Sequence, residues 1–146
     1  MLREQPNLVK GSWWPVLESS ELGRKPVGRV RCGERLVFWR SATGVVCMPD
    51  RCPHRGAALS LGEVNAASDA IACPFHGLEF GTDGHCTLIP VEQDFTIPED
   101  FGVPAHPVTE ADGYVWLWRG PLPEHELPAV PQHADTLPMK YGASGG

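Results

Sequence analysis

The sequence has 146 residues, of which 42% are apolar and 21% charged, with 16 glycines and 15 prolines. This length supports one domain with its own core, and the formal net charge of −6 argues against nucleic acid as a partner, because phosphate binding needs a concentrated basic surface. No stretch approaches the ~18 consecutive apolar residues of a membrane span, and residues 1–10 lack the apolar core of a secretory signal, so we expect a cytoplasmic protein with no membrane partner.

Short runs rich in valine, tryptophan and phenylalanine recur along the chain, which is typical of an all-β fold. We expect strands at 27–31, 35–40, 45–48, 78–80 and 114–118. Three turn signals that end in glycine predict tight hairpins at 42–44, 82–84 and 111–113. The last expected strand, 114–118, alternates aromatic and aliphatic residues, which indicates a core strand covered on both faces.

Between the expected strands lie two loops that each contain one cysteine and one histidine. Cys52 and His54 are separated by one residue, and Cys73 and His76 by two, with Pro after each cysteine and Gly after or near each histidine. A soft thiolate and a borderline imidazole from each loop are what a binuclear iron-sulfur centre with unlike irons requires. A structural zinc site is the alternative, since Cys2His2 is also a zinc ligand set, although zinc fingers usually pair Cys with Cys and His with His.

The remaining cysteines are Cys32, Cys47 and Cys86. An odd number of cysteines without a secretion signal fits reduced thiols or metal ligands better than disulfides. Since these three have no histidine in a convincing ligand spacing, we expect all of them to be small buried hydrophobic residues.

The two loops resemble the Rieske motif, Cys-x-His and Cys-x-x-His, here separated by the 18 residues 55–72. The resemblance implies a [2Fe-2S] cluster bound by Cys52, His54, Cys73 and His76, with the cysteines on the inner iron and the histidines on the outer iron. The longer pattern of WWPV, RCPHRGAALSLG, CPFHGLEF and VWLWRG is similar to the N-terminal Rieske domain of ring-hydroxylating and demethylating oxygenases. It implies a Rieske-type antiparallel β-sandwich with a small cluster-binding subdomain.

Two departures from Rieske relatives suggest how this cluster differs. Leu78 and Phe80 stand where respiratory Rieske proteins place a Ser and a Tyr that hydrogen-bond sulfur, so we expect a potential in the lower part of the Rieske range. Leu78 also replaces the Trp usual in oxygenases. Ala57 and Phe75 occupy about the places of the two extra cysteines of respiratory proteins, which argues against a respiratory role.

We expect residues 1–120 to form the Rieske domain, with a cluster-binding lobe at about 50–90, and the Pro-rich residues 121–146 to form an arm or linker. Oxygenases of this kind continue into a catalytic domain with a mononuclear iron. His125, His133 and Asp135 are the tail residues that could imitate its ligands, but they lie among prolines and are expected to be exposed. We therefore do not expect this chain alone to activate dioxygen, and whether it is an enzyme stays open.

The expected function is one-electron transfer. The donor would be a reductase or a ferredoxin, and the acceptor an oxygenase catalytic domain or another protein. Two alternatives stay open: a free-standing Rieske ferredoxin that shuttles electrons between a reductase and an oxygenase, and, more remotely, a structural zinc module.

Overall fold

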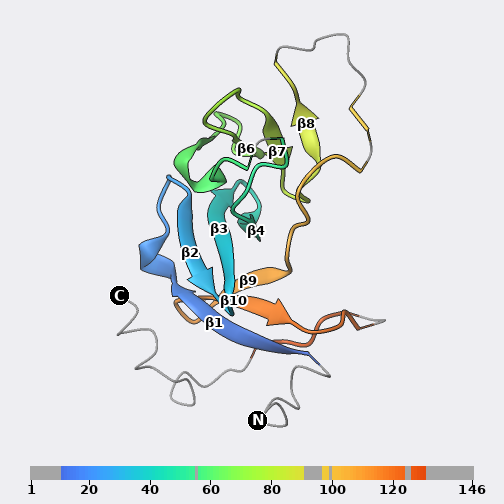
Figure 1. Cartoon of the computed structure of the whole chain (residues 1–146). Helices are drawn as coiled ribbons and strands as arrows, with labels where there is room; N and C mark the ends of the chain where they lie inside the picture. The colour runs from blue at the N-terminus through green and yellow to red at the C-terminus, as the bar shows by residue number, and fades with distance from the viewer. Residues whose placement is uncertain (1–10, 55, 91–96, 99, 124–125, 131–146) are drawn as a thin grey trace. The chain divides into compact units, whose positions relative to one another are not determined.

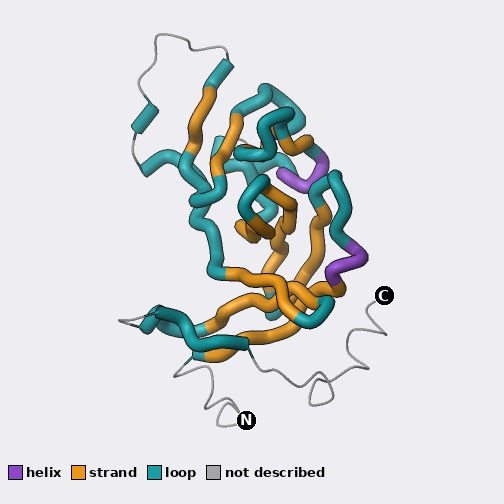
Figure 2. Tube along the Cα trace, turned by 180° about the vertical axis from the view of Figure 1, so that it is seen from behind, coloured by secondary structure: helices purple, strands orange, loops and turns teal. Residues whose placement is uncertain are grey.

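The computed structural model describes residues 11–54, 56–90, 97–98, 100–123 and 126–130 (Figure 1). Within these ranges the chain forms ten strands in three antiparallel sheets and contains no α-helix. The helical segments are two 3-10 turns, η2 (Ser19–Glu21) and η3 (Leu59–Leu61), drawn in purple in Figure 2. The expectation of an all-β fold is confirmed. No helix in the described ranges is long and apolar enough to cross a bilayer.

One compact unit contains the first sheet, in the order β1–β10–β9. Its strands are β1 (Ser12–Glu18), β9 (Val108–Ala111) and β10 (Tyr114–Arg119). The central strand β10 buries four consecutive residues, from Val115 to Trp118, so both of its faces are covered as expected. After β10, the carbonyls of Pro121 and Pro128 accept hydrogen bonds from the indole N–H groups of Trp118 (3.2 Å) and Trp13 (2.7 Å).

The second compact unit, Ser20–Pro107, contains the other two sheets. The sheet β2–β3–β4 consists of β2 (Val27–Arg31), β3 (Glu34–Ser41) and β4 (Gly44–Pro49). The sheet β5–β6–β7–β8 consists of β5 (Glu63–Val64), β6 (Ala70–Ala72), β7 (Glu79–Gly81) and β8 (Cys86–Leu88). Most of the strands are short, as the many glycines and prolines predict.

All three predicted hairpins are present. The turn between β3 and β4 is closed by the pairing of Ser41 with Gly44, and the turn between β7 and β8 by a 2.9 Å hydrogen bond from the Gly84 N–H to the Gly81 carbonyl. Between β9 and β10, Asp112 and Gly113 both have positive φ, 56° and 82°, as a type I′ turn requires.

A fourth hairpin, between β2 and β3, was not predicted, and it overturns one expectation about the cysteines. Cys32 and Gly33 form its two-residue turn, with φ of 53° and 77°, and the pairing of Arg31 with Glu34 closes it. Cys32 is therefore exposed at a hairpin tip, and the expectation that it is buried is wrong. The same expectation is confirmed for Cys47 and Cys86, whose exposed fractions are 0% and 1%.

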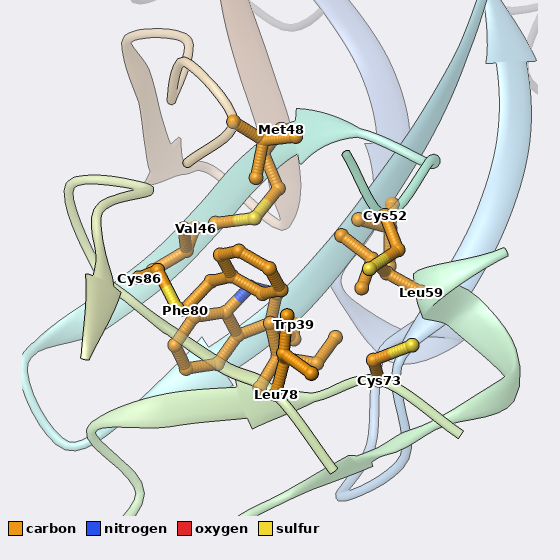
Figure 3. Packing of buried hydrophobic residues seen from close by; sticks show 12 residues of the cluster. Trp39, Val46, Met48, Cys52, Leu59, Cys73, Leu78, Phe80 and Cys86 are labelled. Carbon is orange, nitrogen blue, oxygen red and sulfur yellow. The ribbon is translucent and has the colours of Figure 1, made fainter. Parts of the chain in front are cut away.

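The core of the second unit is a single cluster to which both of its sheets contribute. Figure 3 shows Trp39 of β3 and Phe80 of β7 at its centre, both fully buried. The cluster also includes side chains from the loops that follow β4 and β6, among them Cys52, Leu59, Cys73 and Leu78. The core cluster thus contains side chains from both sheets and from both of the cysteine- and histidine-containing loops.

The different environments of the cysteines predict different reactivities. Burial raises the pKa of the Cys86 thiol, against the smaller opposing effect of a backbone hydrogen bond at Leu88, so little reactive thiolate forms at neutral pH. We expect iodoacetamide to alkylate Cys32 rapidly in the folded protein, and Cys47 and Cys86 only after unfolding. Peptide mapping by mass spectrometry measures this, with Cys32→Ser as the control. Equal labelling of Cys86 and Cys32 in the native protein would contradict the buried position of Cys86.

Candidate metal centre

The first ligand loop follows β4 and leads into η3. The Cys52 N–H donates to the Ala57 carbonyl (2.7 Å), and the Gly56 N–H donates back to the Cys52 carbonyl (2.7 Å). These two bonds close a tight loop around the cysteine. The Cys52 side chain is 1% exposed and belongs to the core cluster, whereas His54 is exposed.

The second ligand loop connects β6 to β7 and has the same hydrogen-bonded skeleton. The Cys73 N–H donates to the Leu78 carbonyl (2.7 Å), and the Gly77 N–H donates to the Cys73 carbonyl (3.1 Å). Cys73 is 5% exposed and His76 is exposed. In both loops, therefore, the cysteine amide bonds the carbonyl five residues later and the cysteine carbonyl bonds the amide four residues later.

Each loop has a glycine four residues after its cysteine, and the backbone conformation there favours glycine. Gly56 has a φ of 78° and Gly77 a φ of 72°, in the left-handed region that a side chain disfavours. The two skeletons are alike, but the histidine comes two residues after Cys52 and three residues after Cys73. The two histidines therefore occupy different positions in two loops of equivalent backbone conformation.

The four predicted residues divide into an inner pair of cysteines and an outer pair of histidines. Figure 3 shows Cys52 and Cys73 at the same end of the core cluster, with Leu59 beside them. The rings of His54 and His76 meet edge to face, with centroids 5.5 Å apart and an interplanar angle of 79°. Two buried thiols and two exposed, adjacent imidazoles are therefore supplied by two equivalent loops.

This donor set fits a binuclear [2Fe-2S] cluster. Each iron of a Rieske cluster takes only two protein ligands, since the bridging sulfides complete its coordination. In the described part of the chain, no three His, Cys, Asp or Glu side chains gather closely enough to hold a single metal ion. Ligands divided between two irons do not need to converge in that way.

The surroundings of the site are apolar on its inner side and mixed on its outer side. Leu78 and Phe80 are 3% and 0% exposed, and neither side chain can donate a hydrogen bond. On the outer side, Phe75 is 68% exposed, and its ring centroid lies 6.3 Å from that of His76. Leu78 of the second loop thus packs in the core cluster.

Three other residues considered in the sequence fall outside the described ranges: His125, His133 and Asp135. One pair of residues near the site was not predicted. Asp50, two residues before Cys52, is a buried carboxylate bonded to Ser60. The only hint in the sequence is a charged residue directly after an apolar strand.

Comparison with known proteins relates this site to a described family. A sequence model of the Rieske [2Fe-2S] domain matches residues 12–107. The vanillate O-demethylase oxygenase subunit of Pseudomonas sp. strain HR199 is 35% identical over 140 residues, which cover 94% of this chain and 37% of that protein. The oxygenase component of dicamba O-demethylase from Stenotrophomonas maltophilia is 33% identical over 139 residues, covering 94% of this chain and 40% of that protein.

Solved structures agree with the sequence comparison. The crystal structure of dicamba monooxygenase bound to dicamba superposes with a TM-score of 0.70 and 33% identity, covering 81% of this chain and 36% of that one. The structure of NdmA from Pseudomonas putida CBB5 with caffeine gives a TM-score of 0.68 at 33% identity. The match covers 72% of this chain and 32% of that one. The chain thus spans less than half the length of these relatives.

The two positive-φ glycines of the loops generate a prediction. Gly77→Ala should cost about 1–2 kcal/mol of stability, because alanine is strained at this φ, and should also lower the iron content by disturbing the loop of Cys73 and His76. Gly33→Ala is the matched control, since Gly33 has a similar φ of 77° but lies in the hairpin turn of Cys32, with open space around it. Thermal unfolding and iron analysis measure both effects. Equal iron content in the two variants would show that the turn at Gly77 does not matter for metal binding.

Proposed function

Because the chain belongs to the Rieske [2Fe-2S] domain family, we propose that Cys52, His54, Cys73 and His76 are the ligands of its cluster and that the domain transfers one electron at a time between protein partners. The observation that carries this proposal is the pair of equivalent loops, with both thiols buried and both imidazole rings meeting at the surface. The same observation supports Cys52 and Cys73 as ligands of the inner iron, and His54 and His76 as ligands of the outer iron.

When bound, such a cluster supplies a one-electron couple, and two neutral imidazoles in place of two thiolates raise its potential above that of an all-cysteine cluster. The protein's own part is to shield the thiols and expose the imidazoles. Since His54 and His76 are the exposed ligands, electrons would enter and leave along their ring edges. The exposed Phe75 beside His76 would offer a docking protein an apolar contact at that point.

The proposed partners follow from the relatives. Two of these are named as an oxygenase subunit and an oxygenase component, and the match covers 37% and 40% of their lengths. We propose a reductase or a ferredoxin as the electron donor and an oxygenase catalytic domain as the acceptor. In this assignment residues 1–120 form the Rieske domain, with the cluster-binding lobe at about 50–90. Residues 121–146 form an arm or linker, of which 124–125 and 131–146 lie outside the described residues.

The two alternatives are less well supported. A free-standing Rieske ferredoxin would use the same four ligands, but the oxygenase-like match extends over 94% of the chain, including the WWPV segment that such ferredoxins usually lack. A zinc module finds no support in the family match, which is to an iron-sulfur domain.

Metal analysis tests the ligand assignment. We expect about two irons and about two acid-labile sulfides per chain, the content of one [2Fe-2S] cluster, and loss of both in Cys52→Ser and Cys73→Ser. The control is His85→Ala, because His85 lies in the turn before β8, where its backbone N–H bonds Asp83 (2.9 Å), outside both ligand loops. Zinc without sulfide in the wild-type protein would refute the proposal, and so would normal iron content in Cys52→Ser.

The reduction potential tests how the surroundings tune the cluster. Since Leu78 and Phe80 lack hydroxyl groups, we expect a potential in the lower part of the Rieske range of about −150 to +300 mV, and Leu78→Ser should raise it by adding a donor next to the second loop. Leu61→Ser is the control. Leu61 is 76% exposed, so the same substitution there adds a hydroxyl group in solvent. A redox titration measures all three proteins, and a wild-type value near the upper end would contradict this account.

A further inference from the structure

We propose that Asp50 and Ser60 form a clamp that closes the first ligand loop and thereby positions Cys52 and His54 for the cluster. The proposal rests on the ligand assignment above and assigns Asp50 and Ser60 a positioning role. Neither residue is proposed to touch the cluster. The clamp is defined by two hydrogen bonds between these residues, and it joins the two ends of the segment that carries both ligands.

Both carboxylate oxygens of Asp50 accept a hydrogen bond from Ser60. The Ser60 backbone N–H donates to Asp50 Oδ1, and the Ser60 hydroxyl donates to Asp50 Oδ2, each over 2.7 Å. Asp50 is 7% exposed, and it is the one buried charged side chain among the described residues. Burying a carboxylate is costly unless it is well bonded, so these charge-assisted hydrogen bonds are strong candidates for a structural role.

Both residues of the clamp are attached to secondary structure of the same unit. Asp50 comes directly after β4, and its backbone N–H donates to the Arg35 carbonyl of β3 (3.0 Å). Ser60 belongs to η3, next to Leu59, which is fully buried in the core cluster. The clamp therefore ties the start of the loop, on the sheet, to its end, on the core.

The second ligand loop shows why the first one needs such a closure. Its ends are Ala72 of β6 and Glu79 of β7, which are paired partners in an antiparallel ladder. The first loop has no paired strands at its ends, because β4 pairs with β3 and η3 belongs to no sheet. Two loops with the same internal skeleton are thus closed in different ways, one by strand pairing and the other by a carboxylate and a serine.

The strand next to the clamp leaves room for it. A Cβ atom added to Gly28 of β2 would lie 2.7 Å from Ser60 Oγ and 2.8 Å from Asp50 Oδ2, which is too close for carbon. Gly28 does not have a positive φ, so space and not backbone conformation calls for glycine here. A methyl group at this position would push the clamp apart without removing any of its hydrogen-bonding groups.

The chemistry of the clamp also defines a rescue variant. Asparagine has the shape of aspartate, and its Oδ1 can still accept from the Ser60 N–H while its Nδ2 donates to the Ser60 hydroxyl. Asp50→Asn therefore keeps both hydrogen bonds and loses only the charge. Asp50→Ala loses both bonds, and Ser60→Ala loses only the bond from the hydroxyl.

The test measures how fast the holoprotein loses its cluster to an iron chelator, together with the reduced-state electron paramagnetic resonance spectrum. Five proteins are compared first: wild type, Asp50→Ala, Asp50→Asn, Ser60→Ala and Gly28→Ala. The matched controls are Asp83→Ala, which removes an exposed carboxylate bonded to a backbone N–H in the β7–β8 turn, and Gly23→Ala, which adds a methyl group in open space. Rates are measured well below the unfolding temperature of each variant.

We expect Asp50→Ala and Gly28→Ala to lose the cluster about tenfold faster than wild type and to show a broadened spectrum, because His54 is held less uniformly. Ser60→Ala should lose the cluster at a rate between those of these variants and that of wild type. Asp50→Asn should have the wild-type rate and the wild-type spectrum. Wild-type rates and spectra in Asp50→Ala, or in Ser60→Ala if Asp50→Ala does not fold, would overturn the clamp. Wild-type protein that binds no iron and sulfide would instead overturn the proposed function, so the two failures are distinguishable.

Discussion

Two backbone hydrogen bonds in each ligand loop, between the cysteine and the residues four and five positions later, set the geometry on which the candidate site depends. They curl each loop around its cysteine, so that the thiol faces the core and the histidine stays at the surface. The bend requires a left-handed residue, which explains the glycine in both loops. Because the same skeleton occurs twice, the two thiols and the two imidazoles fall into matching pairs.

The core of the second unit supports this arrangement from the inside. Cys52 and Cys73 belong to the same buried cluster as Trp39 and Phe80, so the site rests on the packing to which both sheets of that unit contribute. Close packing of large aromatic side chains limits the movement of the loops, which suits a redox centre because little rearrangement should accompany electron transfer. The apolar neighbours also offer no hydrogen-bond donors, so residues that pack in the core are the same ones that we propose to tune the potential.

The two ligand loops share the same internal hydrogen bonds but are closed differently at their ends, and this difference has a physical origin. The second loop joins adjacent strands and is closed by their ladder, whereas the first leaves one sheet and continues into a 3-10 turn. A loop whose ends are not paired retains more conformational freedom, and ordering it needs other bonds. The buried Asp50 and its two bonds to Ser60 lie where that need arises. Similarity to a family supports the proposed ligands, but it does not explain how each loop is held.

The sequence by itself determined the all-β class, the hairpins β3–β4, β7–β8 and β9–β10 and the four candidate ligands, because these depend on local spacing, alternation and turn chemistry. It misplaced Cys32, since a cysteine in a left-handed turn is unusual and composition favours burial. Only the tertiary structure decided that the thiols face inward, that the rings of His54 and His76 meet, and that Asp50 bonds Ser60. These features join residues 10 to 22 positions apart, and no local pattern encodes them, because they arise from packing against sheets that form elsewhere in the chain.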